Sequence, residues 1–455
     1  MEGIKMQKSS RQAQMILNDN LWKVMIKLTL PAIVAMGLHG LNVIFDAIFV
    51  GKFVGELALS GISVAYPLAQ IALGIGSMIG GGAGAYLSIV IGEKDTETQN
   101  KILGNANLLG LVLSIFLMIL LFITAKPLLS FMGGKGEVLE IALSYFRITV
   151  IGMLFWILSL AYNMIIRAEG KMGKAALIMG TGLVVNIVAN YILMVVFRFG
   201  VVGAAWGTNL GMFVYTILQI MYFKSGKTTF KTKVFALRRD SEIMKKIIAL
   251  GMPQLIMSIT GLLLGMVILN AIGAVGTDYD LAFYGVSFRI MTFMMMPINA
   301  FMRSLQPVVG MNFGAKKYDR VISAVKIYIL GALIVIAPIY LWVVLNPQSV
   351  LGLMFEGAIS PENIFNFIIF MSVIPLFTVT MNGMSYFPAI GESKIASTMP
   401  ILRQFILYIP AMIFLPRLFG VRYAYVSAFV IDVFIAIVIG ILLLRSFTKL
   451  RKAMN

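Results

Sequence analysis

Long apolar stretches separated by short polar loops dominate this chain. About twelve of these stretches reach the ~20 residues that an α-helix needs to cross the hydrocarbon core of a bilayer. The pattern therefore predicts an all-α integral membrane protein. The predicted spans are residues 24–50, 57–91, 102–125, 138–166, 176–198, 201–223, 243–273, 281–312, 322–345, 363–390, 397–418 and 421–445.

The two halves of the chain repeat one another. Landmark residues recur in the same order at offsets of about 220 positions, which favours two six-helix lobes. An even number of spans per lobe places both lobes the same way up, so a pseudo-two-fold axis along the membrane normal should relate them. Such a plan leaves a cavity between the lobes and is typical of transporters. The recurring pairs are Pro31 and Pro253, Gly92 and Gly314, Gly170 and Gly391, and Gly200 and Gly420.

This repeat divides the chain into five regions. The first lobe is expected at 24–223 and the second at 247–445, with a basic linker at 224–246 between them. Tails at 1–23 and 446–455 complete the chain. The linker is expected to lie on the cytoplasmic face, where its positive charge favours anionic lipid.

Composition supports a membrane protein and excludes several chemistries. The chain is 60% hydrophobic and 12% charged, whereas soluble domains are about one quarter charged. It has no cysteine and one histidine, so disulfides, thiol catalysis and histidine metal clusters are excluded. The net charge of +18 comes from loops between apolar segments, so we expect the lipid bilayer and not a nucleic acid as the partner.

The distribution of positive charge predicts the orientation in the membrane. Of the 37 Lys and Arg residues, 28 fall on the side of the N-terminus and 7 on the other side. Charges near the ends of spans, among them Arg167 and Arg403, are counted with the adjoining loops. The positive-inside rule then places both termini in the cytoplasm. The first twenty residues are polar, so a removable signal peptide is not expected.

One buried acid is the first candidate for chemistry. Residues 31–56 predict a helix opened by Pro31, and steps of three, four and seven put His39, Asn42 and Asp46 on one face. A carboxylate at the centre of a membrane helix costs about 2.5–3.5 kcal/mol on insertion scales. Asp46 therefore predicts an ion or proton site, with a structural ion pair as the alternative.

Asp432 is the second acid deep within an apolar segment. The repeat supplies no acidic counterpart for either residue, because the equivalents of Asp46 and Asp432 are Ile268 and Gly211. Asp432 is thus a second candidate ionisable site. A salt bridge from Asp432 to Arg289 or Arg303, which both lie within the eighth predicted span, explains its presence equally well.

Three neutral polar residues complete the candidate site. Asn186 and Asn190 are four residues apart and share a helix face, and Thr208 lies in the next span. Together with Asp46 they offer hard oxygen donors, which suit Na⁺ or a relayed proton. Hydrogen bonding between helices is the alternative explanation for such residues.

No sequence motif supports catalysis or ATP-driven transport. We find no Ser–His–Asp set, no HExxH motif and no Walker A loop. The glycine-rich stretch at 74–84 instead favours close helix packing. We therefore expect a protein that is not an enzyme, has no cofactor and draws energy from an H⁺ or Na⁺ gradient.

The chain resembles the multidrug and toxic compound extrusion family over residues 25–445. This resemblance implies a twelve-helix exporter of organic cations or amphipathic toxins in exchange for H⁺ or Na⁺, in the branch of the bacterial multidrug exporters. It also implies a monomer in the bacterial inner membrane. The stretches that carry it are FDAIFVGKFVGELALSGISVAYP (45–67), VNIVANYILMVVFRFGVVGAAWGTNL (185–210), and YGVSFRI with LQPVVGMNFGAKKYDR within 284–320.

The resemblance also implies a site in the first lobe. Relatives in this branch combine an Asp on helix one, an Asn and an Asp on helix five, and a Thr on helix six. Asp46, Asn186 and Thr208 match three of these positions. Asn190 stands where many relatives carry the second Asp, which leaves Asp46 as the sole titrating group.

Another branch of the family carries acids on helices seven and ten. Here those spans contain Gln254, Asn270 and Asn382 instead. A cation site of that type in the second lobe is therefore not expected, and Asp432 is the only acidic candidate there.

Two alternative functions remain open at this point. A flippase for lipid-linked saccharides would need cationic residues in its cavity, and Arg289 and Arg303 are candidates for that role. A channel or a membrane-embedded enzyme is the third possibility. The sequence leaves the substrate and the choice between H⁺ and Na⁺ open.

Overall fold

The computed structural model describes residues 11–231, 233–355 and 359–454. Among these residues, eleven helices are long and apolar enough to cross a membrane, and a twelfth span is the pair α5–α6, which is bent by 54°. The predicted all-helical membrane fold is confirmed. The spans are α2 (Leu21–Phe53), α3 (Glu56–Glu93), α4 (Thr96–Phe131), α5 (Gly136–Ile151) with α6 (Met153–Ala168), α7 (Met172–Tyr191) with the π-helix η1 (Ile192–Val196), α8 (Gly200–Lys224), α9 (Ser241–Val275), α10 (Asp278–Gly314), α11 (Tyr318–Leu345), α13 (Pro361–Met371) with α14 (Ile374–Ala389), α15 (Ser393–Ile401) with the π-helix η2 (Leu402–Tyr408) and α16 (Ile409–Phe419), and α17 (Arg422–Lys452). A short helix, α12 (Pro347–Leu351), precedes α13.

Polar caps set where several helices begin. Asn20 accepts hydrogen bonds from the backbone of Trp22 and so starts α2 at Leu21. Pro31 therefore lies inside this helix, and the expectation that it opens the helix is wrong. A proline inside a helix removes one backbone hydrogen bond, which makes this position a place where α2 can bend.

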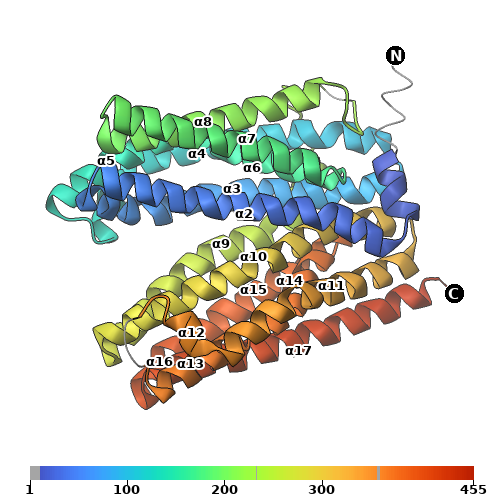
Figure 1. The fold of residues 1–455 in the computed structure, drawn as a ribbon. Helices are drawn as coiled ribbons and strands as arrows, with labels where there is room; N and C mark the ends of the chain where they lie inside the picture. The colour runs from blue at the N-terminus through green and yellow to red at the C-terminus, as the bar shows by residue number, and fades with distance from the viewer. Residues whose placement is uncertain (1–10, 232, 356–358, 455) are drawn as a thin grey trace.

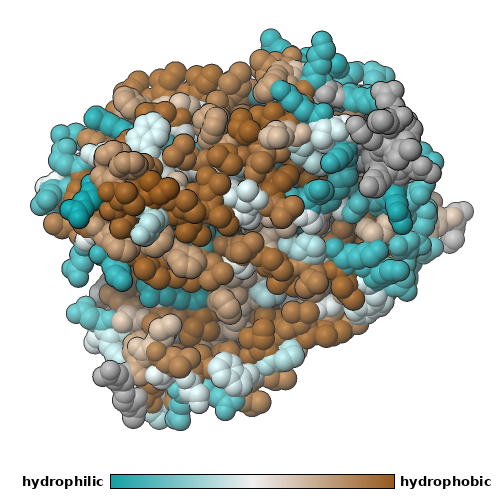
Figure 2. All heavy atoms as spheres, turned by 45° about the horizontal axis from the view of Figure 1, so that its top comes forward, coloured by the Kyte–Doolittle hydropathy of each residue, from teal (hydrophilic) through white to brown (hydrophobic). Residues whose placement is uncertain are grey.

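The helices gather into two bundles. Figure 1 shows α2–α8 in one bundle and α9–α17 in the other, with both chain termini at the same end of the molecule. Hydrophobic side chains cover much of the face seen in Figure 2, and hydrophilic ones collect toward its two ends. This distribution fits a multi-pass protein whose apolar surface meets lipid.

The two bundles touch through glycines near the end that carries the termini. A Cβ atom on Gly82 of α3 would lie 1.8 Å from the carbonyl oxygen of Ile247, and one on Gly251 of α9 would lie 1.8 Å from that of Met78. Real side chains do not approach backbone so closely, so this contact needs glycine on both helices.

Gly92 and Gly314 form a second close contact between the bundles. A Cβ atom on Gly92 would lie 2.1 Å from the Met311 carbonyl oxygen, and one on Gly314 would lie 2.0 Å from that of Ile89. These two glycines are a recurring pair of the sequence repeat. Equivalent residues that touch each other reciprocally lie at the axis that relates two copies.

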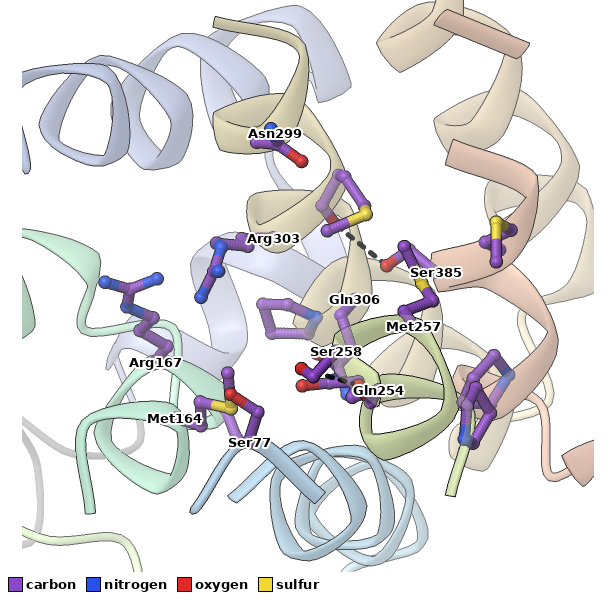
Figure 3. A pocket seen from close by; sticks show the side chains of 16 residues that line it. Ser77, Met164, Arg167, Gln254, Met257, Ser258, Asn299, Arg303, Gln306 and Ser385 are labelled. Carbon is purple, nitrogen blue, oxygen red and sulfur yellow. Dashed lines mark hydrogen bonds between the residues drawn. The ribbon is translucent and has the colours of Figure 1, made fainter. Parts of the chain in front are cut away.

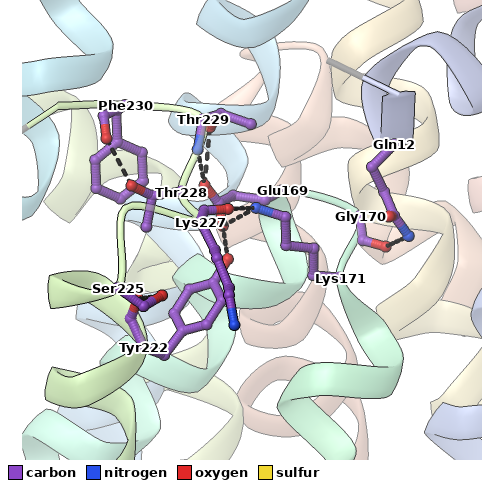
Figure 4. A network of polar contacts seen from close by, with 10 residues as sticks. All are labelled: Gln12, Glu169, Gly170, Lys171, Tyr222, Ser225, Lys227, Thr228, Thr229 and Phe230. Atoms are coloured by element: carbon purple, nitrogen blue, oxygen red, sulfur yellow. Dashed lines mark hydrogen bonds and ion pairs between the residues drawn. The ribbon is translucent and has the colours of Figure 1, made fainter. Parts of the chain in front are cut away.

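The linker that joins the bundles is attached to the first one. Glu169, buried in the loop after α6, accepts hydrogen bonds from the Tyr222 hydroxyl and from the backbone and hydroxyl of Thr229 (Figure 4). Lys171 forms an ion pair of 3.2 Å with Glu169 and also donates to a linker carbonyl. Further along, the amide of Asn107 on α4 donates to the carbonyl of Val234 at 2.7 Å.

The polar N-terminal region also has structure. Residues 11–18 are helical. The Gln12 amide donates to the carbonyl of Gly170 in the first bundle at 3.0 Å (Figure 4). Arg320 at the start of α11 donates to the carbonyl of Ile16 at 3.0 Å and to that of Asp19 at 2.8 Å. This helix thus bridges the two bundles at the end where they touch.

Candidate functional site

Asp46 lies in the last third of α2 and receives hydrogen bonds from two amides. Asn42, one turn earlier on the same helix, donates to its Oδ2 at 3.0 Å. Asn190 of α7 donates to its Oδ1 at 2.7 Å. Of the four ion pairs formed by described residues, none includes Asp46. The carboxylate is therefore held by neutral groups in a half-buried position, without a neighbouring cation to balance its charge.

A stripe of glycines on α8 positions the asparagines of α7. Gly207 and Gly211 are one turn apart, and they face Asn190 and Asn186 respectively. A Cβ atom on Gly207 would lie 2.0 Å from the Oδ1 of Asn190, and one on Gly211 would lie 2.6 Å from the Cβ of Asn186. Small residues at this spacing let two membrane helices pack closely. The stripe therefore brings α7 close to α8 and holds both asparagines buried between them.

Three amide oxygens, two on the residues that bind Asp46 and one on Asn186 a turn away on α7, lack hydrogen-bond partners among the described residues. The Oδ1 atoms of Asn42, Asn186 and Asn190 are buried, and among the described residues none of them accepts a hydrogen bond. Buried polar atoms are normally paired. Carbonyl oxygens next to a carboxylate are the donors that a small hard cation prefers. The residues present therefore fit Na⁺, and the carboxylate alone fits a proton.

Thr208 and Tyr145 stand at the edge of this group. The Thr208 hydroxyl donates to the Ala204 carbonyl of its own helix at 3.0 Å, so in this state it is occupied locally. Tyr145 of α5 lies within electrostatic range of Asp46 and close to Thr208. Sequence reasoning missed Tyr145, because nothing in the pattern of α5 separates it from a packing residue.

His39 does not join Asp46. It lies two turns earlier on α2, exposed to the space between the bundles, within electrostatic range of Arg303 and Arg167. Arg289 is exposed on α10. The predicted residues thus divide into an Asp46 group, a group near Arg303, and Arg289 apart from both.

Asp432 has a different partner from those predicted. Its carboxylate is buried and accepts from the Nε of Arg403 at 2.6 Å and from the Tyr408 hydroxyl at 2.8 Å. The expected salt bridge to Arg289 or Arg303 is therefore wrong. Arg403 belongs to η2, inside the eleventh span, and counting it with a cytoplasmic loop was also wrong. Arg403 lies near the start of an apolar stretch, so the sequence pattern did not indicate that it pairs with Asp432.

A cavity of about 200 Å³ opens between the two bundles (Figure 3). Two arginines face it, Arg167 at the end of α6 and Arg303 in α10. Arg167 is only 6% exposed, although its place at the edge of a predicted span made it look like a loop residue. Among the described residues that line the cavity, none is acidic. The lining residues are Ser77, Met164, Arg167, Ala168, Pro253, Gln254, Met257, Ser258, Asn299, Met302, Arg303, Gln306, Pro307, Met384, Ser385 and Pro388.

Two helical bundles, a cavity between them and a lone carboxylate in one bundle define a multi-pass membrane transporter. Comparison with known proteins agrees. The MatE family model matches residues 31–192. The chain is 25% identical over 408 residues to the multidrug export protein MepA of Staphylococcus saprophyticus, covering 88% of this chain and 89% of that protein. It is also 25% identical to MepA of Staphylococcus aureus strain MSSA476 over 404 residues, with 88% of both chains covered.

Solved structures share the fold. A MATE protein in the bent conformation superimposes with a TM-score of 0.91 at 22% identity, covering 97% of this chain and 98% of that one. An outward-facing MATE family transporter of the MOP superfamily gives 0.88 at 22% identity, with 96% and 98% covered. A MOP superfamily transporter from Pyrococcus furiosus, described as having a binding pocket of reverse polarity, gives the same values. The chain is thus similar over most of its length to MATE multidrug exporters, which are transporters and not enzymes.

Proposed function

We propose that this protein is a secondary antiporter that exports organic cations or amphipathic toxic compounds in exchange for H⁺ or Na⁺. The cavity between a first lobe at 24–223 and a second at 247–445 would open alternately to the two sides of the membrane. The observation that carries the proposal is the Asp46 carboxylate, which has no cationic partner among the described residues. An isolated charge at this depth gives a coupling ion a specific place to bind.

The comparisons support a drug-like substrate. MepA proteins are multidrug exporters, and a solved MATE structure holds a compound called MaD3S. We therefore propose a monomeric exporter in the bacterial plasma membrane, with both termini in the cytoplasm. In that orientation the glycine contacts close the cytoplasmic side, which corresponds to an outward-facing state.

Coupling would work through the charge of Asp46. A bound proton or Na⁺ removes the net charge of the group formed by Asp46, Asn42, Asn190 and Asn186. A ligand shifts a conformational equilibrium only by its different affinity for the two states. Neutralising one buried carboxylate provides such a difference, because the cost of burying the group falls sharply. We propose that α2 then bends near Pro31 and that substrate affinity drops.

The two coupling ions would use the asparagines differently. For a proton, the amides keep donating to the carboxylate oxygens as they do here. For Na⁺, the amides rotate so that their oxygens face the ion. Asn186→Ala removes one of these oxygens and leaves Asp46 intact. It should therefore weaken Na⁺-driven transport and leave ΔpH-driven transport unchanged.

The test of the proposal is transport by reconstituted protein. Wild type and Asp46→Asn are placed in liposomes with a fluorescent organic cation, and ΔpH and a Na⁺ gradient are imposed separately. We expect Asp46→Asn to lose gradient-driven transport at least tenfold while it keeps its fold, because the variant carries no charge to neutralise. Asp278→Asn, at an exposed acid in the first turn of α10, is the matched control. Undiminished transport by Asp46→Asn would refute the proposal.

One observation favours a second candidate. Arg303 faces the central cavity, as a flippase for a pyrophosphate-linked lipid would require, whereas Arg289 does not line it. Such a flippase would move a fluorescent lipid-linked saccharide between leaflets in the same liposomes. Its activity would persist in Asp46→Asn if no ion is coupled. Ion conductance without substrate would instead indicate a channel.

A further inference from the structure

The cavity between the bundles carries positive charge that no acid balances. Arg167 and Arg303 lie next to each other at one side of it (Figure 3). The Nη1 of Arg167 and the Nε of Arg303 are buried and, within the described part of the chain, have no hydrogen-bond partner. Neither arginine takes part in an ion pair between described residues. These are donors without an acceptor.

Two buried guanidinium groups that face each other repel and are costly to desolvate. Elsewhere in this chain a buried arginine is paired, as Arg403 is with Asp432. The two arginines of the cavity, in contrast, have no acidic partner among the described residues. A planar fork of N–H donors matches the oxygens of a carboxylate or a phosphate. An external oxyanion would therefore complete this site.

The rest of the lining suits an amphiphile. Polar side chains, among them Gln254 and Asn299, line the same cavity and offer further hydrogen bonds (Figure 3). Methionines, among them Met257 and Met384, supply flexible apolar contacts on the same walls. A volume of about 200 Å³ is below the ~300–1,000 Å³ of pockets that enclose a drug-sized ligand. The cavity therefore holds a head group and a short part of an apolar body.

We infer that Arg167 and Arg303 form a binding site for the anionic head group of an acidic amphiphile, a carboxylate or phosphate ester joined to an apolar body. This inference rests on the proposed export function, since it assigns the chemical class of a substrate to the cavity between the lobes. It is separate from the Asp46 group, which lies within the first bundle. His39 lies within electrostatic range of both arginines but does not line the cavity.

Binding to the purified full-length protein tests the site without any gradient. The protein is placed in nanodiscs of zwitterionic lipid and titrated with 11-(dansylamino)undecanoic acid, whose fluorescence reports an apolar environment. The matched probes are its methyl ester and an analogue in which a quaternary ammonium replaces the carboxylate. We expect the acid to bind at least tenfold more tightly than either, because only the acid carries an oxyanion.

Substitutions locate the site. Arg303→Gln and Arg167→Gln should each weaken binding of the acid roughly tenfold to hundredfold, the range expected when a hydrogen bond to a charged group is lost. Arg303→Lys should restore part of the affinity, since it keeps the charge and loses the fork. Arg289→Gln is the matched control, because Arg289 lies on the same helix, is exposed and does not line the cavity. Loss of affinity in Arg289→Gln equal to that in Arg303→Gln would overturn the assignment.

Competition identifies the source of the oxyanion. Inorganic phosphate is added in one arm, and phosphatidylglycerol replaces part of the nanodisc lipid in another. Competition by phosphatidylglycerol that disappears in Arg303→Gln supports a lipid head group as the occupant. Competition by inorganic phosphate with the same dependence supports a free oxyanion. Tight binding of the methyl ester or the ammonium probe, or unchanged binding of the acid to both arginine variants, overturns the inference.

Thermal unfolding keeps the test valid for variants that fold poorly. An unpaired buried charge destabilises the protein without ligand, so Arg167→Gln and Arg303→Gln should melt at higher temperature than wild type in its absence. The same variants should lose the stabilisation that the acid gives to wild type. A lower melting temperature together with full stabilisation by the acid would contradict the inference.

Asp46→Asn separates this inference from the export proposal. The variant should still bind the acid at least tenfold more tightly than its methyl ester, because Asp46 is absent from the cavity lining. If wild type binds the acid through the arginines but shows no gradient-driven transport, the export proposal fails and the anion site stands. If transport depends on Asp46 but the acid binds no better than its ester, the anion site fails and the export proposal stands.

Discussion

Asp46 and Asp432, the two aspartates deep within apolar segments, occupy opposite environments. Asp46 in the first bundle is held by two neutral amides at 2.7 and 3.0 Å. Asp432 in the second bundle is neutralised by Arg403 at 2.6 Å and accepts a hydrogen bond from the Tyr408 hydroxyl. A carboxylate with its own cation has little reason to take up a proton or Na⁺, whereas one without such a partner does. On this comparison we propose that ion coupling belongs to the first lobe and that Asp432 has a structural role in the second.

Equivalent positions in the two lobes show how this difference arises. At the repeat offset of 221, Arg403 and Asp432 correspond to Gly182 and Gly211 in the first lobe. A Cβ atom on Gly182 would lie 3.5 Å from the carbonyl oxygen of Gly211, so α7 and α8 are in backbone contact there. One lobe joins its last two helices by close packing and the other by a buried ion pair. Close packing at Gly211 places this residue against Asn186.

The contacts between the lobes differ in the same way. At the offset of 222, Gly251 and Gly82 correspond to Thr29 and Ser304. The glycines allow backbone contact between α3 and α9. Thr29 and Ser304 join α2 to α10 through a hydroxyl hydrogen bond of 2.7 Å. The scaffold is duplicated, and its polar chemistry has diverged in each copy.

The largest expected effect comes from breaking the ion pair of the second lobe. Arg403→Leu leaves the Asp432 carboxylate buried without its cation, and we expect a loss of about 3–5 kcal/mol of stability. Adding Asp432→Asn should recover most of this loss. Unfolding of the purified variants measures the effect. The matched Asp46→Asn should cost far less, because it removes a charge that lacks a partner; an equal loss would contradict the comparison.

An intermediate effect is expected at the glycine contact between the lobes. Gly251→Ala places a Cβ atom 1.8 Å from the Met78 carbonyl oxygen, and overpacking of this kind costs about 1–3 kcal/mol. The variant should therefore favour the state in which this end is open. The chain has no cysteine, so a Ser77→Cys background allows labelling of the cavity from the side of the termini. Labelling should accelerate in Gly251→Ala.

Two controls sharpen that measurement. Gly261→Ala changes the same helix at a position where nothing lies within 4 Å, and labelling should stay at the wild-type rate. Thr29→Ala alters the equivalent contact between α2 and α10 and loses only a hydrogen bond, worth about 0.6 kcal/mol in membrane proteins. Faster labelling in Gly261→Ala than in Gly251→Ala would show that packing between the lobes does not control access.

The smallest effect is expected from restoring a second acid to the first lobe. Asn190→Asp places a carboxylate next to Asp46, where Asn190 now donates at 2.7 Å. Two like charges resist ionising together, so a proton is retained to higher pH. The pH of half-maximal ΔpH-driven transport should rise by about one unit, equivalent to about 1.4 kcal/mol. The same change at Asn270, an exposed asparagine in the second lobe, is the control; equal profiles would argue against coupling at Asp46.

The sequence predicted the spans and the residues around Asp46 because both depend on local patterns. Apolar length sets whether a helix can cross a bilayer, and the helical period places Asn42 on the face of Asp46. The glycine stripe of α8 did not stand out among the many glycines of the chain. The approach of Asn190 to Asp46 depends on how α7 packs against both α8 and α2, which the sequence alone does not give.

Only the tertiary structure decided the partners of the charged residues. Arg167 and Arg403 lie near the ends of apolar stretches, where a positive charge is typical of the adjoining loop. Helix packing turned one toward the cavity and the other toward Asp432. Ion pairs in a membrane protein depend on how each helix is rotated against its neighbours. Hydrophobic length along the chain does not encode that rotation, because lipid and buried protein both accept apolar side chains.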